Sequence, residues 1–286
     1  MHGLEQRRVG RDGAEVRSEE LVRRARVEVR AELGFDPSVL SERTRLVAVT
    51  GASNLLGTRP DVPSIAAAVH AAGALLYVDG VHLTPHTAVS MRELGADFYA
   101  CSPYKFFGPH LGVVAADPAL LETVHPDKLL PSTEEVPERF ELGTLPYEML
   151  AGVTAAVDFM AGLAPGDAEG RRDRLVASMT ALEEQEDVLF RRLLSGLQDI
   201  EGVTTYGAPA RRTPTALLDV AGRSGREVYE HLASGGVNAP AGSFYAIEAA
   251  RWLGLGDAGA VRAGLAPYTS EADVDRLLTA VAEIAK

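Results

Sequence analysis

Short apolar runs alternate with helical patterns in the first half of the chain. Four runs have the composition of buried strands: 46–50, 75–79, 97–101 and 112–115. Between the first two, Asp61 in an N-cap position and an Ala-rich stretch to Ala72 predict a helix that Gly73 ends. A shorter helix is predicted over 89–94. A strand, a crossover helix and a strand form a βαβ unit with parallel strands, so the pattern predicts a doubly wound α/β sheet.

A break near residue 165 separates this pattern from a second one. A long helix follows, with its leucines on one face. Further strands and helices are then predicted at 215–220, 227–233, 244–253, 261–265 and 271–284. Ser270 and Asp273 form a capping-box signal for the last helix. We therefore expect a large domain over 1–165 and a smaller C-terminal α+β domain over 166–286.

Charge narrows the range of partners. In residues 1–45, arginines alternate with acidic residues, as at Arg26, Glu28 and Arg30. Interspersed signs of this kind are typical of a solvated helix face. The whole chain has 28 basic and 40 acidic residues and a net charge of −12. This acidic excess argues against nucleic acid as a partner.

Cysteine content and hydropathy indicate the compartment. Cys101 is the single cysteine, so no internal disulfide is possible. No apolar run approaches the roughly 20 residues of a membrane span. The N-terminus has no hydrophobic signal core. We expect a soluble cytoplasmic protein that binds no membrane.

Polar residues follow three of the predicted strands at one edge of the sheet. Asn54 comes after the first strand, Asp79 closes the second, and Ser102 and Lys105 follow the third. The carboxyl ends of parallel strands border the ligand crevice of an open sheet. Lys105 has aromatic neighbours, including Tyr104, which would partly desolvate its amine and lower its pKa.

This arrangement has two interpretations. A carboxylate and a nucleophilic lysine on neighbouring strand ends suit pyridoxal phosphate, whose ring acts as an electron sink when its nitrogen is protonated. Alternatively, Asp79 caps the following turn and Lys105 is a solvated loop residue. The spacing of the residues leaves both interpretations open.

Family resemblance favours the cofactor. The segment Ser102–Gly112 resembles the lysine motif of class V aminotransferases, the cysteine desulfurase-like group in particular. Four further segments resemble motifs of the same family and occur in the family's order: Ala52–Thr58, Asp79–His82, Phe140–Thr144 and Val261–Leu265. The resemblance implies a pyridoxal-phosphate protein of fold type I, with a mostly parallel sheet in its large domain.

The resemblance also implies roles in holding the cofactor. Lys105 would be the Schiff-base lysine, and Asp79 would pair with the pyridinium nitrogen. Asn54 and His82 would contact the ring oxygen. Three further cofactor contacts are implied: Ser102 at the phosphate, Tyr104 at a position often held by histidine, and Thr144 at the phosphate of the other subunit.

The implied substrate and assembly follow from two of these matches. Arg262 would grip the carboxylate of a small amino-acid substrate through a bidentate contact. The sharing of Thr144 between subunits implies a homodimer. We expect an enzyme that acts at the α-carbon of an amino acid, by transamination, epimerisation or elimination.

Two departures from the family bear on activity. Relatives that form a persulfide carry a loop cysteine shortly before the arginine strand, whereas Gly235–Tyr245 contains none. The relatives' earlier phosphate-binding turn and stacking ring have no counterpart in residues 1–45. We therefore expect a truncated or diverged N-terminal part and no sulfur transfer by the usual route. The alternative is a catalytically impaired remnant that acts as a dimerisation or binding module.

Other site chemistries have weaker support. Asp79, His82 and His86 resemble a metal-ligand set, but Pro85 disfavours the helix that would bring the two histidines together, and we predict no metal. The sequence after Ser53 lacks the second glycine of a hydrolase elbow. No Walker A loop is present.

Overall fold

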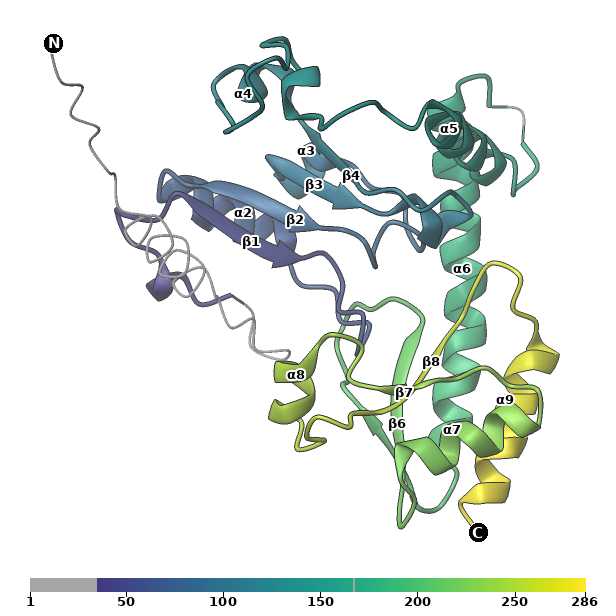
Figure 1. Cartoon of the computed structure of the whole chain (residues 1–286). Coiled ribbons are helices and arrows are strands. Elements are labelled where there is room, and N and C mark those ends of the chain that lie inside the picture. Colours follow the sequence, from purple (N-terminus) through teal and green to yellow (C-terminus); the bar gives the residue numbers. More distant parts are fainter. Residues whose placement is uncertain (1–34, 167) are drawn as a thin grey trace, which may run out of the picture.

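A computed structural model describes residues 35–166 and 168–286. The mixed-charge helix face predicted for the N-terminal arginines lies outside these residues. Two sheets, one from each half of the chain, are joined by a long helix that runs beside both (Figure 1). The predicted domain boundary at 165/166 lies between two helices of this connection. It stays a prediction.

The first sheet has the strand order β1-β2-β3-β4. Its strands are β1 (Leu46–Thr50), β2 (Leu75–Asp79), β3 (Phe98–Cys101) and β4 (Val113–Ala116). The first three strands are parallel, and β4 is antiparallel to β3. Thr50 pairs with Asp79, and Asp79 with Ala100, so the carboxyl ends of the parallel strands are level. All four predicted strands are confirmed to within a residue.

Helices cover one face of this sheet. α2 (Val62–Ala71) begins at Asp61, whose carboxylate accepts a hydrogen bond from the Ser64 backbone, as predicted. The short helix α3 (Met91–Leu94) begins two residues later than predicted. The opposite face leaves Leu46 44% and Val114 58% exposed. The described residues therefore cover one face of the sheet, where a doubly wound sheet has helices on both.

Several short elements and two long helices connect the sheets. They are η1 (Pro37–Val39), which precedes β1, and then η2 (Pro103–Phe106), α4 (Pro118–Glu122), η3 (Glu138–Phe140), α5 (Tyr147–Ala161) and α6 (Arg171–Gln198). α5 packs against α6 through Met160, Met179 and Leu182. The predicted long helix is confirmed as α6, whereas α5 was not predicted.

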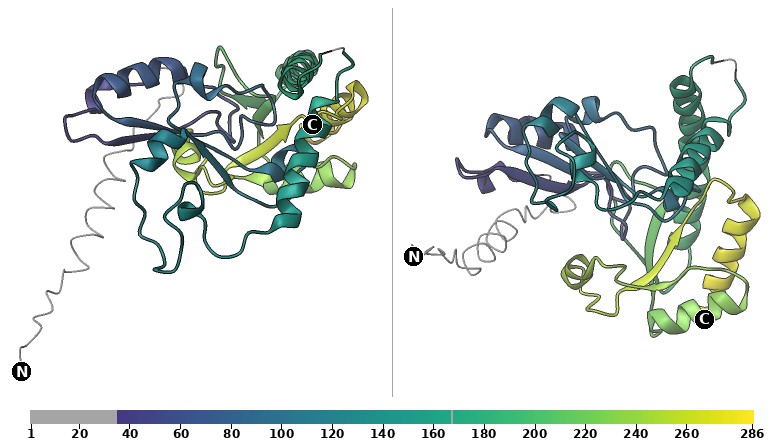
Figure 2. Two further views of the ribbon diagram at one scale, coloured as in Figure 1. Left: turned by 90° about the horizontal axis from the view of Figure 1, so that it is seen from above. Right: turned by 45° about the horizontal axis from the view of Figure 1, so that its top comes forward.

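The second sheet is antiparallel, with the order β5-β6-β8-β7. Its strands are β5 (Val203–Tyr206), β6 (Thr215–Val220), β7 (Ala241–Gly242) and β8 (Ala260–Gly264), and its helices are α7 (Gly225–Ser234), α8 (Ile247–Trp252) and α9 (Glu271–Ile284). α6, α7 and α9 lie beside this sheet (Figure 2). The core between them includes Leu193, Leu197 and Leu218. The capping box of Ser270 and Asp273 is confirmed.

One predicted helix begins at the wrong residue. The pattern placed a helix over 244–253, but α8 starts at Ile247. Phe244 and Tyr245 have φ values of 53° and 65°, in the left-handed region that a helix excludes. These two residues form a turn between β7 and α8.

The two sheets meet through short loops. Thr58, after β1, forms an isolated bridge with Arg212, before β6. The Arg59 backbone N–H donates to the Arg211 carbonyl. No helix in the described part of the chain has the length and apolar character needed to cross a membrane.

Candidate active site

Four predicted site residues, carried by both sheets, interact electrostatically. Asp79 ends β2, His82 lies in the turn after it, Lys105 lies in η2, and Arg262 lies in β8. Burial lowers the pKa of the Lys105 amine, Arg262 lowers it further, and Asp79 partly offsets both effects. The positive charge of Arg262, from the second sheet, thus acts on the lysine that follows the first.

A tight turn presents Asp79 and His82. The Asp79 carboxylate accepts a hydrogen bond from the Val81 backbone at 3.0 Å. Between them, a Cβ at Gly80 would lie 1.9 Å from the ring of Tyr99, so this position excludes any side chain. Close packing against β3 therefore fixes the turn after β2. The hydrogen bond to Val81 is the turn cap that the alternative interpretation of Asp79 expects.

His82 is held as a neutral imidazole. Its Nε2 lies 3.1 Å from the hydroxyl oxygens of both Thr213 and Thr215. Burial, followed by the charges of His86, Lys105 and Arg262, lowers its pKa to about 3. Sequence reasoning missed the two threonines, because they lie more than a hundred residues away and carry no motif.

Lys105 has an unengaged amine. It is half-buried, and its Nζ makes no hydrogen bond or ion pair with any described residue. The preceding residue, Tyr104, stacks on His110 with ring centroids 4.8 Å apart and is 46% exposed. Phe107, which ends η2, has a φ of 67°. The chain thus turns sharply at Phe107, two residues after the lysine.

Asn54 and Arg262 are joined through the turn that was predicted to be helical. Arg262 Nη1 donates to the Asn54 carbonyl at 2.7 Å. Asn54 Nδ2 donates to the Phe244 carbonyl at 2.6 Å. The Phe244 ring lies against the Arg262 guanidinium, 3.9 Å from its centroid to Cζ. Sequence analysis named Asn54 and Arg262. It missed Phe244, for which the sequence carried no signal.

The structure places the remaining predicted residues less tightly. Ser102 lies directly before η2 and is half-buried, and its hydroxyl has no partner among residues 35–166 and 168–286. Thr144 is exposed between η3 and α5. No hydrogen bond within the described chain joins it to Asp79 or Lys105. The roles of Ser102 and Thr144 stay predictions.

The single cysteine has the environment of a core residue. Cys101 ends β3, is partly buried and packs against the core of the first sheet. Burial raises the pKa of its thiol. A raised pKa disfavours the thiolate, which is the nucleophilic form.

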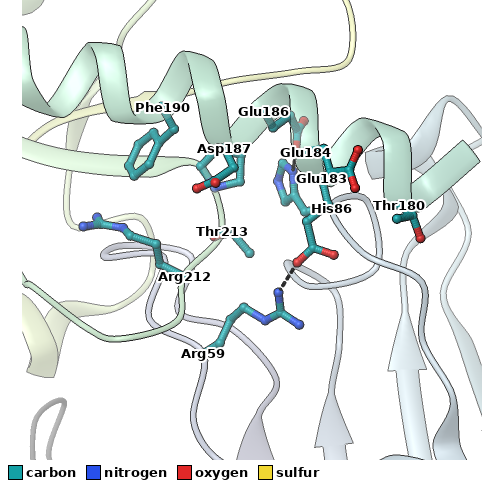
Figure 3. Close-up of a pocket in the computed structure, with 11 residues that line it drawn as sticks. Arg59, His86, Thr180, Glu183, Glu184, Glu186, Asp187, Phe190, Arg212 and Thr213 are labelled. Atoms are coloured by element: carbon teal, nitrogen blue, oxygen red, sulfur yellow. Dashed lines mark hydrogen bonds and ion pairs between the residues drawn. The ribbon is translucent and has the colours of Figure 1, made fainter.

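A cavity of about 300 Å³ lies beside the His82 turn, between α6 and the loops after β1 and β2 (Figure 3). Arg59 pairs with Glu183 at 2.6 Å, and His86 Nδ1 lies 2.9 Å from a Glu186 carboxylate oxygen. Thr213, which contacts His82, also lines this cavity. In the described residues, no three histidine, cysteine or acidic side chains are arranged to hold a metal ion.

The fold is that of a class of protein, the pyridoxal-phosphate proteins of fold type I. Residues 8–277 match the family model of class-V aminotransferases, and the chain belongs to this family. The predicted fold class and family are thereby confirmed.

Similarity to individual proteins is moderate and covers only part of each of them. The chain is 34% identical to an aminotransferase-like protein of Gibberella zeae over 85% of its own length and 60% of the relative's. It is 31% identical to a probable cysteine desulfurase of Halalkalibacterium halodurans, over 83% and 57% respectively. A cysteine desulfurase structure from Thermococcus onnurineus superposes with a TM-score of 0.76 at 26% identity, covering 91% of this chain and 65% of that one. The chain thus spans about 60% of these curated relatives.

Proposed function

We propose that this chain is a pyridoxal-phosphate enzyme that acts on an amino acid, as a cytoplasmic homodimer. The observation that carries the proposal is the unengaged, half-buried amine of Lys105, which lies within the electrostatic reach of Asp79 and Arg262. A lysine with a lowered pKa has more of the neutral amine that attacks carbonyl carbons. Because the chain belongs to the class-V aminotransferase family, pyridoxal phosphate is the carbonyl compound to test.

The donors and acceptors present fit this cofactor. Lys105 would hold it covalently through Nζ, and the Asp79 carboxylate would accept a hydrogen bond from the protonated ring nitrogen and so keep that nitrogen charged. The neutral His82 and the Asn54 amide would face the ring oxygen, and the free hydroxyl of Ser102 would donate to the phosphate. Tyr104 would lie beside that phosphate.

The reaction then depends on what each side chain does. When bound, the cofactor supplies an electron sink for the negative charge that develops at the substrate's α-carbon. Arg262 would bind the substrate carboxylate. The Lys105 amine, once released, would take and return the α-proton at Nζ. A neutral His82 adds no positive charge beside that amine.

Persulfide chemistry is not part of the proposal. Cys101 is partly buried with a raised pKa, and Gly235–Tyr245 contains no cysteine. This leaves proton transfer at the α-carbon, which leads to transamination, epimerisation or elimination, as the reaction class.

A non-enzymatic function is the second candidate, because one face of the first sheet exposes Leu46 and Val114. Apolar side chains exposed on the same face of a sheet are a feature of interaction surfaces. On this alternative, the protein is a catalytically impaired dimerisation or binding module, and added cofactor forms no link to Lys105.

Absorption spectroscopy with added pyridoxal phosphate separates the two candidates. The chain has three lysines, at 105, 128 and 286, so attachment can be assigned unambiguously. We expect the absorption band of lysine-linked cofactor in the parent protein and in the matched control Lys128→Ala, and its loss in Lys105→Ala. Borohydride reduction and peptide mapping should then place the label on Lys105. A folded parent protein with no band would favour the binding module.

A further inference from the structure

Phe244 lies against the side chain that would bind the substrate. Its ring centroid is 3.9 Å from Cζ of Arg262, the shortest of the three arginine–aromatic contacts between described residues. An aromatic face attracts a guanidinium and stacks parallel to its plane. The ring therefore covers one face of the guanidinium and leaves its nitrogen edges free for hydrogen bonds.

The backbone at Phe244 is strained and held by contacts. Phe244 and Tyr245 both have positive φ values, 53° and 65°. Such conformations cost energy in residues other than glycine and persist where the surrounding structure enforces them. Here Asn54 Nδ2 donates to the Phe244 carbonyl, and the Ala246 N–H donates to the Ser243 carbonyl. Both contacts hold the ring over Arg262.

Arg262 is left with an open edge. Nη1 donates to the Asn54 carbonyl, while Nε and Nη2 donate to no described residue. No described carboxylate pairs with Arg262, although the side chain is only partly exposed. Nε and Nη2 together form an edge that suits a bidentate carboxylate. Arg262 is thus half-buried, has no described counter-ion, and keeps two parallel donors, Nε and Nη2, free for a ligand.

We propose that Phe244 is a positioning residue that orients Arg262 toward the carboxylate of an α-amino acid. This inference rests on the proposed function. Without the ring, the guanidinium keeps a single contact, Nη1 to Asn54, and rotates about its last side-chain bonds. Fewer molecules then present the Nε–Nη2 edge, and carboxylate binding weakens while cofactor attachment at Lys105 is unaffected.

The test compares Phe244→Ala with Phe244→Trp and Tyr245→Ala. Tryptophan restores an aromatic face, and Tyr245 is a matched control because it shares the left-handed backbone and is fully exposed. The cofactor-loaded proteins are titrated with L-alanine and L-alaninamide, which lacks the carboxylate, and the cofactor band is followed. We expect Phe244→Ala to weaken L-alanine binding roughly 3- to 30-fold. Phe244→Trp and Tyr245→Ala should retain it, and alaninamide binding should be equal in all four proteins.

A second readout needs neither cofactor nor substrate. Phenylglyoxal modifies accessible guanidinium groups, and peptide mass spectrometry gives the rate at Arg262. Removal of the ring should raise this rate in Phe244→Ala, and Phe244→Trp should return it to the parental value. Circular dichroism confirms that each variant is folded.

The two readouts distinguish failure of the inference from failure of the proposed function. Equal L-alanine affinity in the parent and Phe244→Ala would overturn the role of Phe244, even where the cofactor band forms. A parent without a band would refute the proposed function. In that case, or where L-alanine leaves the band unchanged, the labelling rate decides. An unchanged rate at Arg262 would overturn the inference, and a faster rate would support the shielding of Arg262 by Phe244 on which the inference depends.

Discussion

Lys105 combines properties that work in opposite directions. Its amine must be buried enough to lose its proton and open enough to react, and it is half-buried, with a cation and an anion near enough to shift its pKa. Arg262 and Asp79 have opposite effects on its pKa. The same two side chains would contact substrate and cofactor, so the reactivity of the lysine is coupled to both ligands.

This coupling predicts the pH dependence of Lys105. Burial and Arg262 lower its pKa, so Arg262→Gln should raise it and move the onset of amine reactivity to higher pH. Asp79 raises the pKa, so Asp79→Asn should shift the onset to lower pH. The measurement is the rate of trinitrobenzenesulfonate labelling at Lys105 against pH, in protein without cofactor. Labelling of Lys128 and Lys286 serves as an internal reference, and shifts of the same sign in both variants would contradict the prediction.

At the scale of elements, the sequence predicted features that depend on neighbouring residues better than features that depend on contacts between distant parts of the chain. The strands at 46–50 and 75–79 were predicted because buried parallel strands are short and apolar. The start of α8 was wrong, because Asn54, almost two hundred residues away, holds the carbonyl of Phe244. The antiparallel direction of β4 follows from the short connection after β3, which contains only η2, where a parallel strand needs a longer crossover. Candidate residues came from strand ends and motifs, whereas their partners Thr213 and Thr215 depend on packing between the sheets.

The turn after β2 gives a prediction at this scale. Any side chain at position 80 would overlap the ring of Tyr99, which is itself buried in the core. Gly80→Ala should therefore lower the free energy of unfolding by about 1–3 kcal/mol and displace Asp79 and His82. Gly112→Ala is the matched control, since a Cβ there meets no atom within 4 Å. Urea denaturation of both variants measures the effect, and equal midpoints would show that the turn accommodates a side chain.

At the scale of the whole molecule, the segment around Thr144 is exposed and makes no hydrogen bond to Asp79 or Lys105 of its own chain. Leu130 and Leu142 are 97% and 77% exposed, and Thr144, two residues after Leu142, is exposed as well. Apolar side chains this exposed are typical of a surface that another chain covers. A second copy of the chain would bury them and would bring its threonine toward the partner's cofactor phosphate. This arrangement supports the proposed homodimer.

Mixing Lys105→Ala with Thr144→Ala tests whether the site is shared. Lys105→Ala removes the attachment point from its own site, and Thr144→Ala removes the phosphate contact from the partner's site. In a mixed dimer, the lysine of one chain and the threonine of the other form one intact site. Random exchange of subunits should therefore restore tight cofactor attachment at roughly a quarter of all sites. The measurement is the amplitude of the cofactor band at low cofactor concentration, before and after the subunits are exchanged. A mixture that gives only the average of its two components would place Thr144 outside the partner's site, even where sedimentation shows a dimer.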